Sequence, residues 1–240
     1  MHLDTPAIVC AVLPHGEHGA VVRFLTPADG LVAGYVRGGQ SRALRPVLQA
    51  GNGVEVALRA RTDSQLAAAT VELTAARAAL ATSVAGLATL TWLTGLTATV
   101  LAEAVPHPVL YHTLGAIMSA IAADAGPLAL GEAVVRYEFL LLAELGLGLD
   151  LTCCAATGSG DDLVYVSPKS RQAVSRGAGL PYANVMLPLP PMLTGGGVDA
   201  AGVHDGLRLT GHFLERDVLA GRGRDLLPAR ERLASRLPPR

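Results

Sequence analysis

The first 76 residues contain five short apolar runs that are separated by turn-forming residues, and no crossover helix is predicted between them. Parallel neighbouring strands need a long connection, usually a helix, whereas antiparallel strands can be joined by a short turn. Five strands in so short a segment fit a small closed barrel of the OB type. The predicted strands are Ile8–Leu13, Ala20–Thr26, Leu31–Arg37, Val54–Arg61 and Gln65–Leu73.

Turn signals stand where the chain must reverse between these runs. In Pro27-Ala28-Asp29-Gly30, the proline presets φ and the glycine accepts the positive φ that a tight reversal requires. Further signals are Pro14-His15-Gly16, Gly51-Asn52-Gly53 and Thr62-Asp63-Ser64. The spacing therefore predicts a compact sheet with short connections.

Beyond Ala75 the pattern changes to long helical stretches, and Pro or Gly follows the first three of them. In one stretch, Val134, Val135, Phe139, Leu142 and Leu145 recur at helical spacing. The predicted helices are Ala75–Ala104, Val109–Ala125, Leu128–Leu145, a helix near Gly206–Ala220 and a short one at Arg230–Arg236.

These patterns place the chain in the α+β class, with an OB-like β-barrel followed by an α-helical domain. The barrel is expected over residues 1–76 and the helical domain over residues 77–240. Three consecutive helices with short connections predict a bundle. Residues 151–195 form an irregular lobe within the helical domain, with one predicted strand at Leu163–Val166.

One uncharged segment, Ala78–Ala102, is long enough to cross a bilayer. Six Thr, one Ser and two Gly interrupt it, and no basic cluster flanks either end to set an orientation. A buried bundle helix is therefore expected rather than a membrane span. The N-terminus lacks the pattern of a secretory signal, and three cysteines suggest no disulfide framework. The cytoplasm is the expected compartment.

Basic residues are numerous only locally, because the formal net charge of the chain is -1. Binding to nucleic acid must therefore depend on clustering rather than on overall charge. Between Leu31 and Arg61, Glu55 is the only acidic residue among five arginines, which are Arg37, Arg42, Arg45, Arg59 and Arg61. A second Arg-rich stretch, Arg208–Arg240, is diluted by acidic residues.

The segment Arg37–Pro46 is the most informative polar segment. Three guanidinium groups around a Gly-rich turn leave room for a nucleic-acid backbone, and Arg can grip phosphate through two hydrogen bonds. A Walker phosphate loop is excluded, because that motif ends in Gly-Lys-Ser/Thr and no such Lys is present. A solvated loop in an Arg-biased protein remains the alternative.

A catalytic or metal site is not predicted. The seven histidines are scattered, and the close pairs His15/His18 and His107/His112 lack a nearby Cys or an i+4 partner on one clear helix face. Asp161-Asp162 lies in a Gly/Ser turn, where adjacent carboxylates point apart. No nucleophile, base and orienting group occur together, so no enzyme activity and no cofactor are expected.

Two sets of residues form motifs that extend along nearly the whole chain. The first set runs through the Arg-rich segment, and the second begins in the predicted helix that ends near Leu145. The residues are Thr26, Gly30, Gly34, Gly38, Ser41, Arg42, Leu44, Pro46 and Leu48, then Arg136–Leu141, Glu144–Gly146, Leu149–Leu151, Cys154-Ala155, Asp162–Pro168, Ala173–Arg176 and Phe213-Leu214. These motifs resemble those of the RecO family of bacterial recombination mediators.

The resemblance implies an OB barrel joined to an α-domain that binds single- and double-stranded DNA. It also implies annealing of complementary strands, and help for RecA in replacing single-strand-binding protein (SSB) on DNA. RecR and the C-terminal tail of SSB are the implied partners, RecA is an indirect one, and the protein is expected to associate with the nucleoid. Arg37, Arg42 and Arg45 are then the first candidates for phosphate contacts, with Arg59 and Arg61 on the adjoining strand.

Arg136 lies where the family presents a basic residue beside a hydrophobic groove, so it is a candidate for the SSB tail. A surface ion pair with Glu132, four residues earlier, is an equally good interpretation. The alternative to a DNA-binding mediator is a protein-interaction adaptor with little DNA affinity of its own, which the near-neutral net charge would allow.

Some RecO proteins carry a four-cysteine zinc site in the lobe, and this chain departs from that pattern. Cys154 stands at the first position of the Cys-x-x-Cys motif, but Thr157 occupies the second position. No Cys follows between Lys169 and Gly179. The lobe is therefore expected to resemble a zinc finger without its metal ligands.

Overall fold

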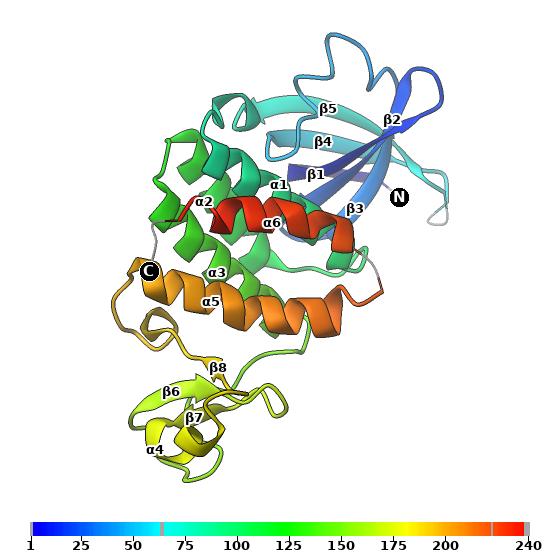
Figure 1. Ribbon diagram of the computed structural model, residues 1–240. Coiled ribbons are helices and arrows are strands. Elements are labelled where there is room, and N and C mark those ends of the chain that lie inside the picture. Colours follow the sequence, from blue (N-terminus) through cyan, green and yellow to red (C-terminus); the bar gives the residue numbers. More distant parts are fainter. Residues whose placement is uncertain (1, 63–64, 222, 238–240) are drawn as a thin grey trace. The chain divides into compact units, whose positions relative to one another are not determined.

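The five predicted strands form a closed barrel in the computed structural model, which describes residues 2–62, 65–221 and 223–237. The barrel belongs to the first of two compact units, Met1–Ala125 with Asp225–Arg230. Its strands are β1 (His2–His15), β2 (Gly19–Thr26), β3 (Gly30–Val36), β4 (Gly53–Arg59) and β5 (Ala67–Ala75) (Figure 1).

The strand order around the barrel is β1-β2-β3-β5-β4, and pairing of β4 with β1 closes it. All neighbours are antiparallel except β3 and β5, which are parallel. The expected α+β class with an N-terminal OB-like barrel is thereby confirmed. Of the turn after Thr62, Asp63 and Ser64 lie outside the described residues.

β1 is much longer than the predicted strand Ile8–Leu13, because it pairs with two neighbouring strands. Its first half, from His2 to Ile8, pairs with β4, and its second half pairs with β2. A register shift between Val9 and Ala11 bends the strand between these partners. The sequence pattern missed the first half because Thr5 and Pro6 interrupt the apolar alternation.

The barrel interior is filled by alternate side chains from every strand, and the largest of them is Phe24. Gly30 begins β3 with φ 69°, as the predicted turn requires. A Cβ atom there would lie 1.9 Å from the carbonyl oxygen of Val105, so only glycine fits. Gly30 thus allows the β2–β3 turn to contact the backbone of Val105, in the segment that follows residues 84–100.

Two helices belong to the same unit as the barrel: α1 (Val84–Val100) and α2 (Pro108–Ala122). Ser83 caps α1 by accepting a hydrogen bond from the backbone N–H of Gly86 at 3.0 Å, which explains why the helix begins later than predicted. Trp92 and Leu93 of α1 are fully buried. Among the described residues, no helix is both long and apolar enough to span a membrane.

The second unit, Gly126–Arg224 with Glu231–Arg240, contains the remaining elements except the first part of α6. α3 (Pro127–Glu144) packs against α5 (Ala200–Phe213), where Gly131 and Gly206 admit the side chains of Val203 and Val135. α5 continues into a π-helical turn at Leu214–Val218. The chain also forms α6 (Leu227–Ala234).

The irregular lobe lies in the second unit and contains a three-stranded sheet with the order β7-β6-β8. The predicted strand appears as β6 (Leu163–Val166), whereas β7 (Ala173–Ser175) and β8 (Leu187–Pro188) were not predicted. The short helix α4 (Arg176–Gly179) follows β7 directly. The domain boundary between residues 76 and 77 stays a prediction from the sequence.

Candidate nucleic-acid interface

The connection between β3 and β4, residues 37–52, carries three of the predicted arginines and is held in place at both ends. Near its start, the Gln40 side-chain amide donates to the carbonyl oxygens of Gly16 and Gly19, at 3.2 and 2.9 Å. The backbone N–H of Gln40 donates to the carbonyl oxygen of His18 at 3.1 Å. These bonds join the connection to the β1–β2 hairpin.

Near its end, the buried side chain of Asn52 ties the connection to the barrel unit. Its Nδ2 group donates to the carbonyl oxygens of Pro46 and Val47, at 2.9 and 3.1 Å. Its Oδ1 atom accepts from the backbone N–H of Ala78 at 3.0 Å. Because Asn52 is only 1% exposed, the β3–β4 connection is part of the folded unit rather than a loosely attached loop.

A pocket of about 700 Å³ lies between the connection and β1 and β2. Arg42 and Arg45 contribute to its lining, and Gln40 and Gln49 add amide groups. The lining contains no acidic residue among the described residues. Its other members are Val12, Pro14, Ala20, Gly39, Pro46 and Leu48.

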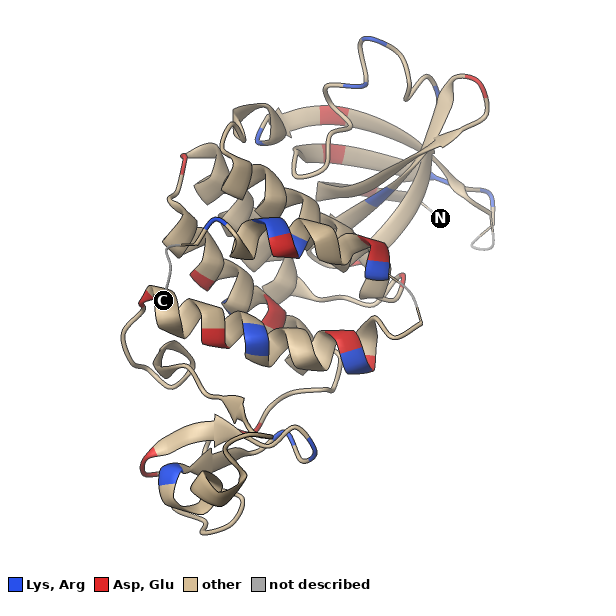
Figure 2. Cartoon of the chain, viewed as in Figure 1, with Lys and Arg blue, Asp and Glu red and all other residues tan. Residues whose placement is uncertain are grey.

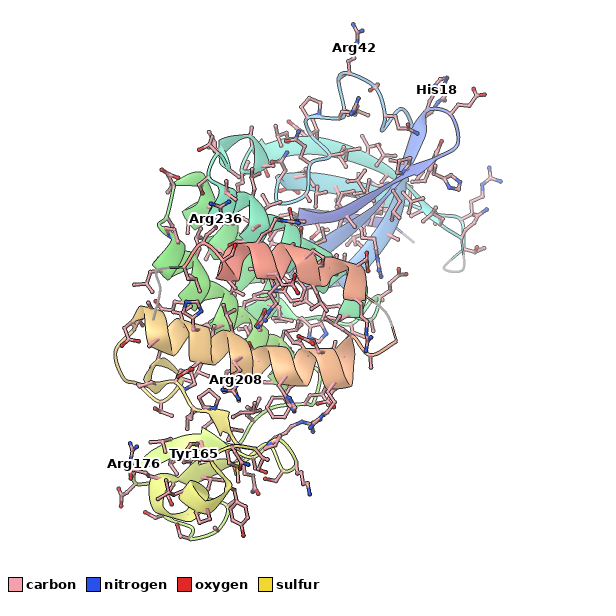
Figure 3. All side chains as sticks on the ribbon, in the orientation of Figure 1. His18, Arg42, Tyr165, Arg176, Arg208 and Arg236 are labelled. Carbon is pink, nitrogen blue, oxygen red and sulfur yellow. The ribbon has the colours of Figure 1, made fainter. Side chains whose placement is uncertain are left out.

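The guanidinium groups of Arg37, Arg42 and Arg45 are exposed and have no ion-pair partner within residues 2–62, 65–221 and 223–237. Gly38, with φ 70°, provides the turn that follows the first of them. Arg42 stands at the outer end of the connection, and His18 at the tip of the neighbouring hairpin (Figure 3). The structure therefore leaves these three positive charges available to an anionic ligand.

Arg59 and Arg61 lie elsewhere, around a second pocket that they share with His2 and Ala60. The Nη2 group of Arg59 donates to both carboxylate oxygens of Asp4 at 2.8 Å, and its Nη1 group donates to the carbonyl oxygens of Leu3 and Leu58. Bonding to Arg59 also lowers the pKa of Asp4. Most donors of Arg59 are thus already used, whereas Arg61 is exposed.

A third surface of the barrel is acidic. Asp4, Glu55 and Glu72 line a shallow pocket formed by β1, β4 and β5. Figure 2 shows acidic residues on β4 and β5, and basic residues in the β3–β4 connection. Because anions are repelled by carboxylates, the charge distribution favours the connection over this surface as a site for an anionic ligand.

In the second unit, Arg136 forms the ion pair with Glu132 that helical spacing allows, with Nε 2.8 Å from Oε1. The guanidinium is half exposed, and it lies on α3. Two residues further along, Glu138 is fully buried and accepts a hydrogen bond from the hydroxyl of Thr210 on α5. Arg136 is therefore on the surface of a helix whose opposite side packs into the core.

Cys154, the residue at the first position of the zinc motif, is buried in the lobe. The backbone N–H of Ser175 donates to its Sγ atom at 3.3 Å, and hydrogen bonding by Ser175 and Thr157 lowers the pKa of the thiol to about 6. The described residues contain no group of three or more His, Cys, Asp or Glu side chains that could hold a metal ion. The residues present do not fit a four-cysteine zinc site, and the absence of zinc stays a prediction for metal analysis.

Sequence reasoning missed Gln40 and Asn52, the two residues that hold the β3–β4 connection. Both lie in segments that were noticed for their glycines, Gly38-Gly39 and Gly51–Gly53. An amide side chain beside glycines in a turn can bond to the backbone, but the partners Gly16, Gly19 and Ala78 are distant in sequence and could not be identified from it. The second Arg-rich stretch is only partly described, since Arg222 and Arg240 lie outside the described residues.

Two family models match this chain and together cover most of it. The model described as "Recombination protein O N terminal" matches residues 1–77, and the model described as "Recombination protein O C terminal" matches residues 82–224. The first match spans the barrel, and the second begins just before α1.

Several relatives named "DNA repair protein RecO" are similar over nearly their full length. The one from Sinorhizobium medicae is 44% identical over 239 residues, which cover 96% of this chain and 92% of the relative. The one from Caulobacter vibrioides (strain NA1000 / CB15N) is 43% identical over 240 residues, covering 99% and 98%. The one from Rhodospirillum rubrum is 43% identical over 236 residues, covering 96% and 94%. The chain belongs to the RecO family of DNA repair proteins.

Proposed function

We propose that this protein is a DNA-binding recombination mediator that anneals complementary strands and helps RecA replace SSB on single-stranded DNA. The observation that carries the proposal is the group of three exposed arginines on an OB-like barrel, none of them paired with a carboxylate among the described residues. Barrels of this type commonly bind nucleic acid through strand faces and loops. Membership of a DNA repair family supports the same role.

In this proposal Arg37, Arg42 and Arg45 bind the phosphates of the DNA backbone. A guanidinium group can bind two phosphate oxygens at once, and phosphate contacts do not depend on base sequence. A strand held by its backbone leaves most of its bases free to pair with a complementary strand. The β3–β4 connection is already anchored by Gln40 and Asn52, so binding does not require it to fold first.

The proposed partners are single- and double-stranded DNA, RecR and the C-terminal tail of SSB, with RecA involved indirectly. The half-exposed guanidinium of Arg136 is the proposed contact for the acidic SSB tail, and it would exchange its bond to Glu132 for one to the tail. We assign no enzyme activity and no cofactor. A place in the cytoplasm, associated with the nucleoid, follows from the proposed role.

A second candidate function is a protein adaptor with little DNA affinity, which the net charge of -1 and the acidic surface at Asp4, Glu55 and Glu72 favour. Titration of a labelled oligonucleotide with the protein separates the two, because only the mediator binds it directly. The adaptor would still bind an SSB-tail peptide.

The experiment that tests the whole proposal is strand annealing on SSB-coated DNA, with and without RecR. A mediator accelerates annealing of the coated complementary strands, and the Arg37→Ala/Arg42→Ala/Arg45→Ala variant does not. SSB-coated strands to which this protein has not been added give the baseline rate of annealing. Annealing at the baseline rate, in the presence of wild-type protein with or without RecR, would contradict the proposal.

A further inference from the structure

The pocket beside the β3–β4 connection has a lining that suits more than phosphate. Its Arg42 and Arg45 side chains supply positive charge, but Val12, Pro46 and Leu48 supply apolar surface. A phosphate group is fully polar and would leave that apolar surface unused. A ligand that combines an anionic part with a flat, weakly polar part matches the lining better.

The size of the pocket points the same way. Its volume of about 700 Å³ falls within the ~300–1,000 Å³ that is usual for small-molecule sites. Such a volume accommodates an entire nucleotide rather than only a phosphate. Gln49 is exposed at the pocket, and its amide offers both a donor and an acceptor to the edge of a base.

The walls of the pocket are fixed relative to one another. Gln40 bonds to the β1–β2 hairpin, while Val12 and Ala20 lie on the two strands of that hairpin. Asn52 holds the other end of the connection through Pro46. The pocket is therefore preformed, and a ligand does not have to order it.

We infer that this pocket holds one unstacked nucleobase of a single DNA strand, while Arg42 and Arg45 bind the phosphates on either side of that nucleotide. The inference rests on the proposed DNA-binding function and deepens it. A base inside a duplex is stacked and paired, so it reaches such a pocket only after it has left the helix. The pocket thus makes the barrel prefer single strands over duplex DNA.

The test uses the full-length protein and three labelled ligands: an oligothymidine, an oligonucleotide of equal length with abasic sites, and a duplex. The wild-type protein should bind the abasic strand about fivefold more weakly, which corresponds to ~1 kcal/mol. A strand that carries 2-aminopurine should become more fluorescent on binding, because this base brightens when it is unstacked and no aromatic ring lines the described part of the pocket.

A double variant, Val12→Met/Gln49→Met, narrows the pocket and removes one amide without touching an arginine. Its matched control is Val21→Met/Gln65→Met, which changes a partly buried valine and an exposed glutamine of the same barrel outside the pocket lining. The pocket variant should lose both the base preference and the 2-aminopurine signal, and keep its duplex affinity and the salt dependence of binding. The control should behave like the wild type.

The inference is overturned if the folded pocket variant keeps the base preference, or if it loses single-strand and duplex affinity equally. If a melting curve shows that the variant does not fold, the affinities of the wild-type protein still test the inference. Equal affinity of the wild-type protein for the abasic strand and for oligothymidine would refute a base pocket. If the wild-type protein binds none of the three ligands, the proposed function itself is refuted.

Discussion

Arginines occur in two contrasting settings in this protein, in the β3–β4 connection of the barrel and in the lobe of the second unit. In the connection, Arg42 and Arg45 project from a turn-rich segment and have no carboxylate partner among the described residues. In the lobe, the guanidinium groups of both arginines, Arg171 and Arg176, are bound to carboxylates. Arg176 pairs with Asp162 at 3.3 Å, and Arg171 pairs with Asp217 at 2.9 Å.

Arg171 belongs to a cluster around Asp217, from which the exposed Arg176–Asp162 pair is separate. The Asp217 carboxylate accepts hydrogen bonds from Arg171 and from the neighbouring Arg216, whose Nη1 group also donates to the carbonyl oxygen of Pro168. Both guanidinium groups lie over the ring of Phe213, at 5.9 and 5.1 Å from its centroid. The cluster connects the lobe to the segment that follows α5. The lobe is thus attached by the Arg171–Asp217 ion pair, and its residues do not fit a zinc site.

The contrast teaches that an Arg-rich composition supports two different roles. A partly buried arginine that is bound to a carboxylate is costly to separate from its partner. An exposed arginine without a partner contributes little to stability and is available to a ligand. Variants of the two regions should therefore change different properties.

Replacement of Asp217 by Ala should have the largest effect on stability. It leaves the partly buried guanidinium of Arg171 and the exposed one of Arg216 without their carboxylate, which should cost ~2–3 kcal/mol of the free energy of unfolding. Urea denaturation measures the loss. The matched control, Asp162→Ala, breaks an exposed pair and should cost ~0.5 kcal/mol or less. Equal losses in the two variants would refute the structural role of the cluster.

The pH dependence of the same site gives a second prediction. Hydrogen bonding by Arg216, and then by Arg171, holds the pKa of Asp217 below its ordinary value of 3.8. A carboxyl group whose folded pKa is lowered stabilises the protein at pH values above 3.8, and that stability is lost as the pH falls through the folded pKa. The stability difference between wild type and Asp217→Asn should therefore be full at neutral pH and shrink below pH 3.8. A constant difference across that range would contradict this.

Replacement of Asn52 by Ala should release the β3–β4 connection. Two carbonyl oxygens and the backbone N–H of Ala78 lose a buried partner, which should cost ~2 kcal/mol of stability. Hydrogen exchange of residues 37–52 should accelerate in the folded variant. Replacement of the neighbouring exposed Gln49 by Ala serves as the control and should leave exchange unchanged.

Replacement of Gln40 by Ala should have a smaller effect, ~1 kcal/mol, because its two hydrogen bonds lie near the surface. The connection would remain anchored through Asn52 but would detach from the β1–β2 hairpin. DNA affinity should fall about fivefold as the arginines lose their fixed spacing. Unchanged affinity in fluorescence anisotropy would show that this anchoring is irrelevant to binding.

Replacement of Arg59 by Ala should have the smallest effect on DNA binding, about twofold or less, because its guanidinium already binds Asp4. Anisotropy at low salt measures the change. A loss as large as that caused by Arg42→Ala would show that Arg59 leaves Asp4 to bind DNA.

The number of barrel strands and their approximate positions could be predicted from the sequence because turn residues separate five short apolar runs. The length of β1 could not, since Pro6 breaks the pattern and only the partner strand β4 reveals the pairing. The strands β7 and β8 contain three and two residues, too few for any periodicity to show. α5 begins at Ala200 rather than near Gly206 because Asp199 caps it, a local signal hidden behind Gly195–Gly197.

The residue types of the candidate site could be predicted from the sequence, but the ion-pair partners of its arginines could not. The Arg-rich segment is visible in the sequence, but Arg59 and Asp4 are 55 positions apart, so the bond that occupies Arg59 needed the folded barrel. The pocket likewise depends on the hairpin that Gln40 contacts. Charge clusters can be read directly from sequence, whereas the availability of each charge depends on its spatial neighbours.

The central claim, that the β3–β4 connection binds DNA through its arginines, is tested most directly by the salt dependence of single-strand binding. The Arg37→Ala/Arg42→Ala/Arg45→Ala variant should bind far more weakly at low salt, and its salt slope should fall by about 2, since each phosphate contact contributes roughly 0.7. The control Arg208→Ala/Arg232→Ala/Arg236→Ala removes the same charge from exposed sites and should keep the wild-type slope. A wild-type slope in the first variant, or an equal loss in both, would contradict the claim.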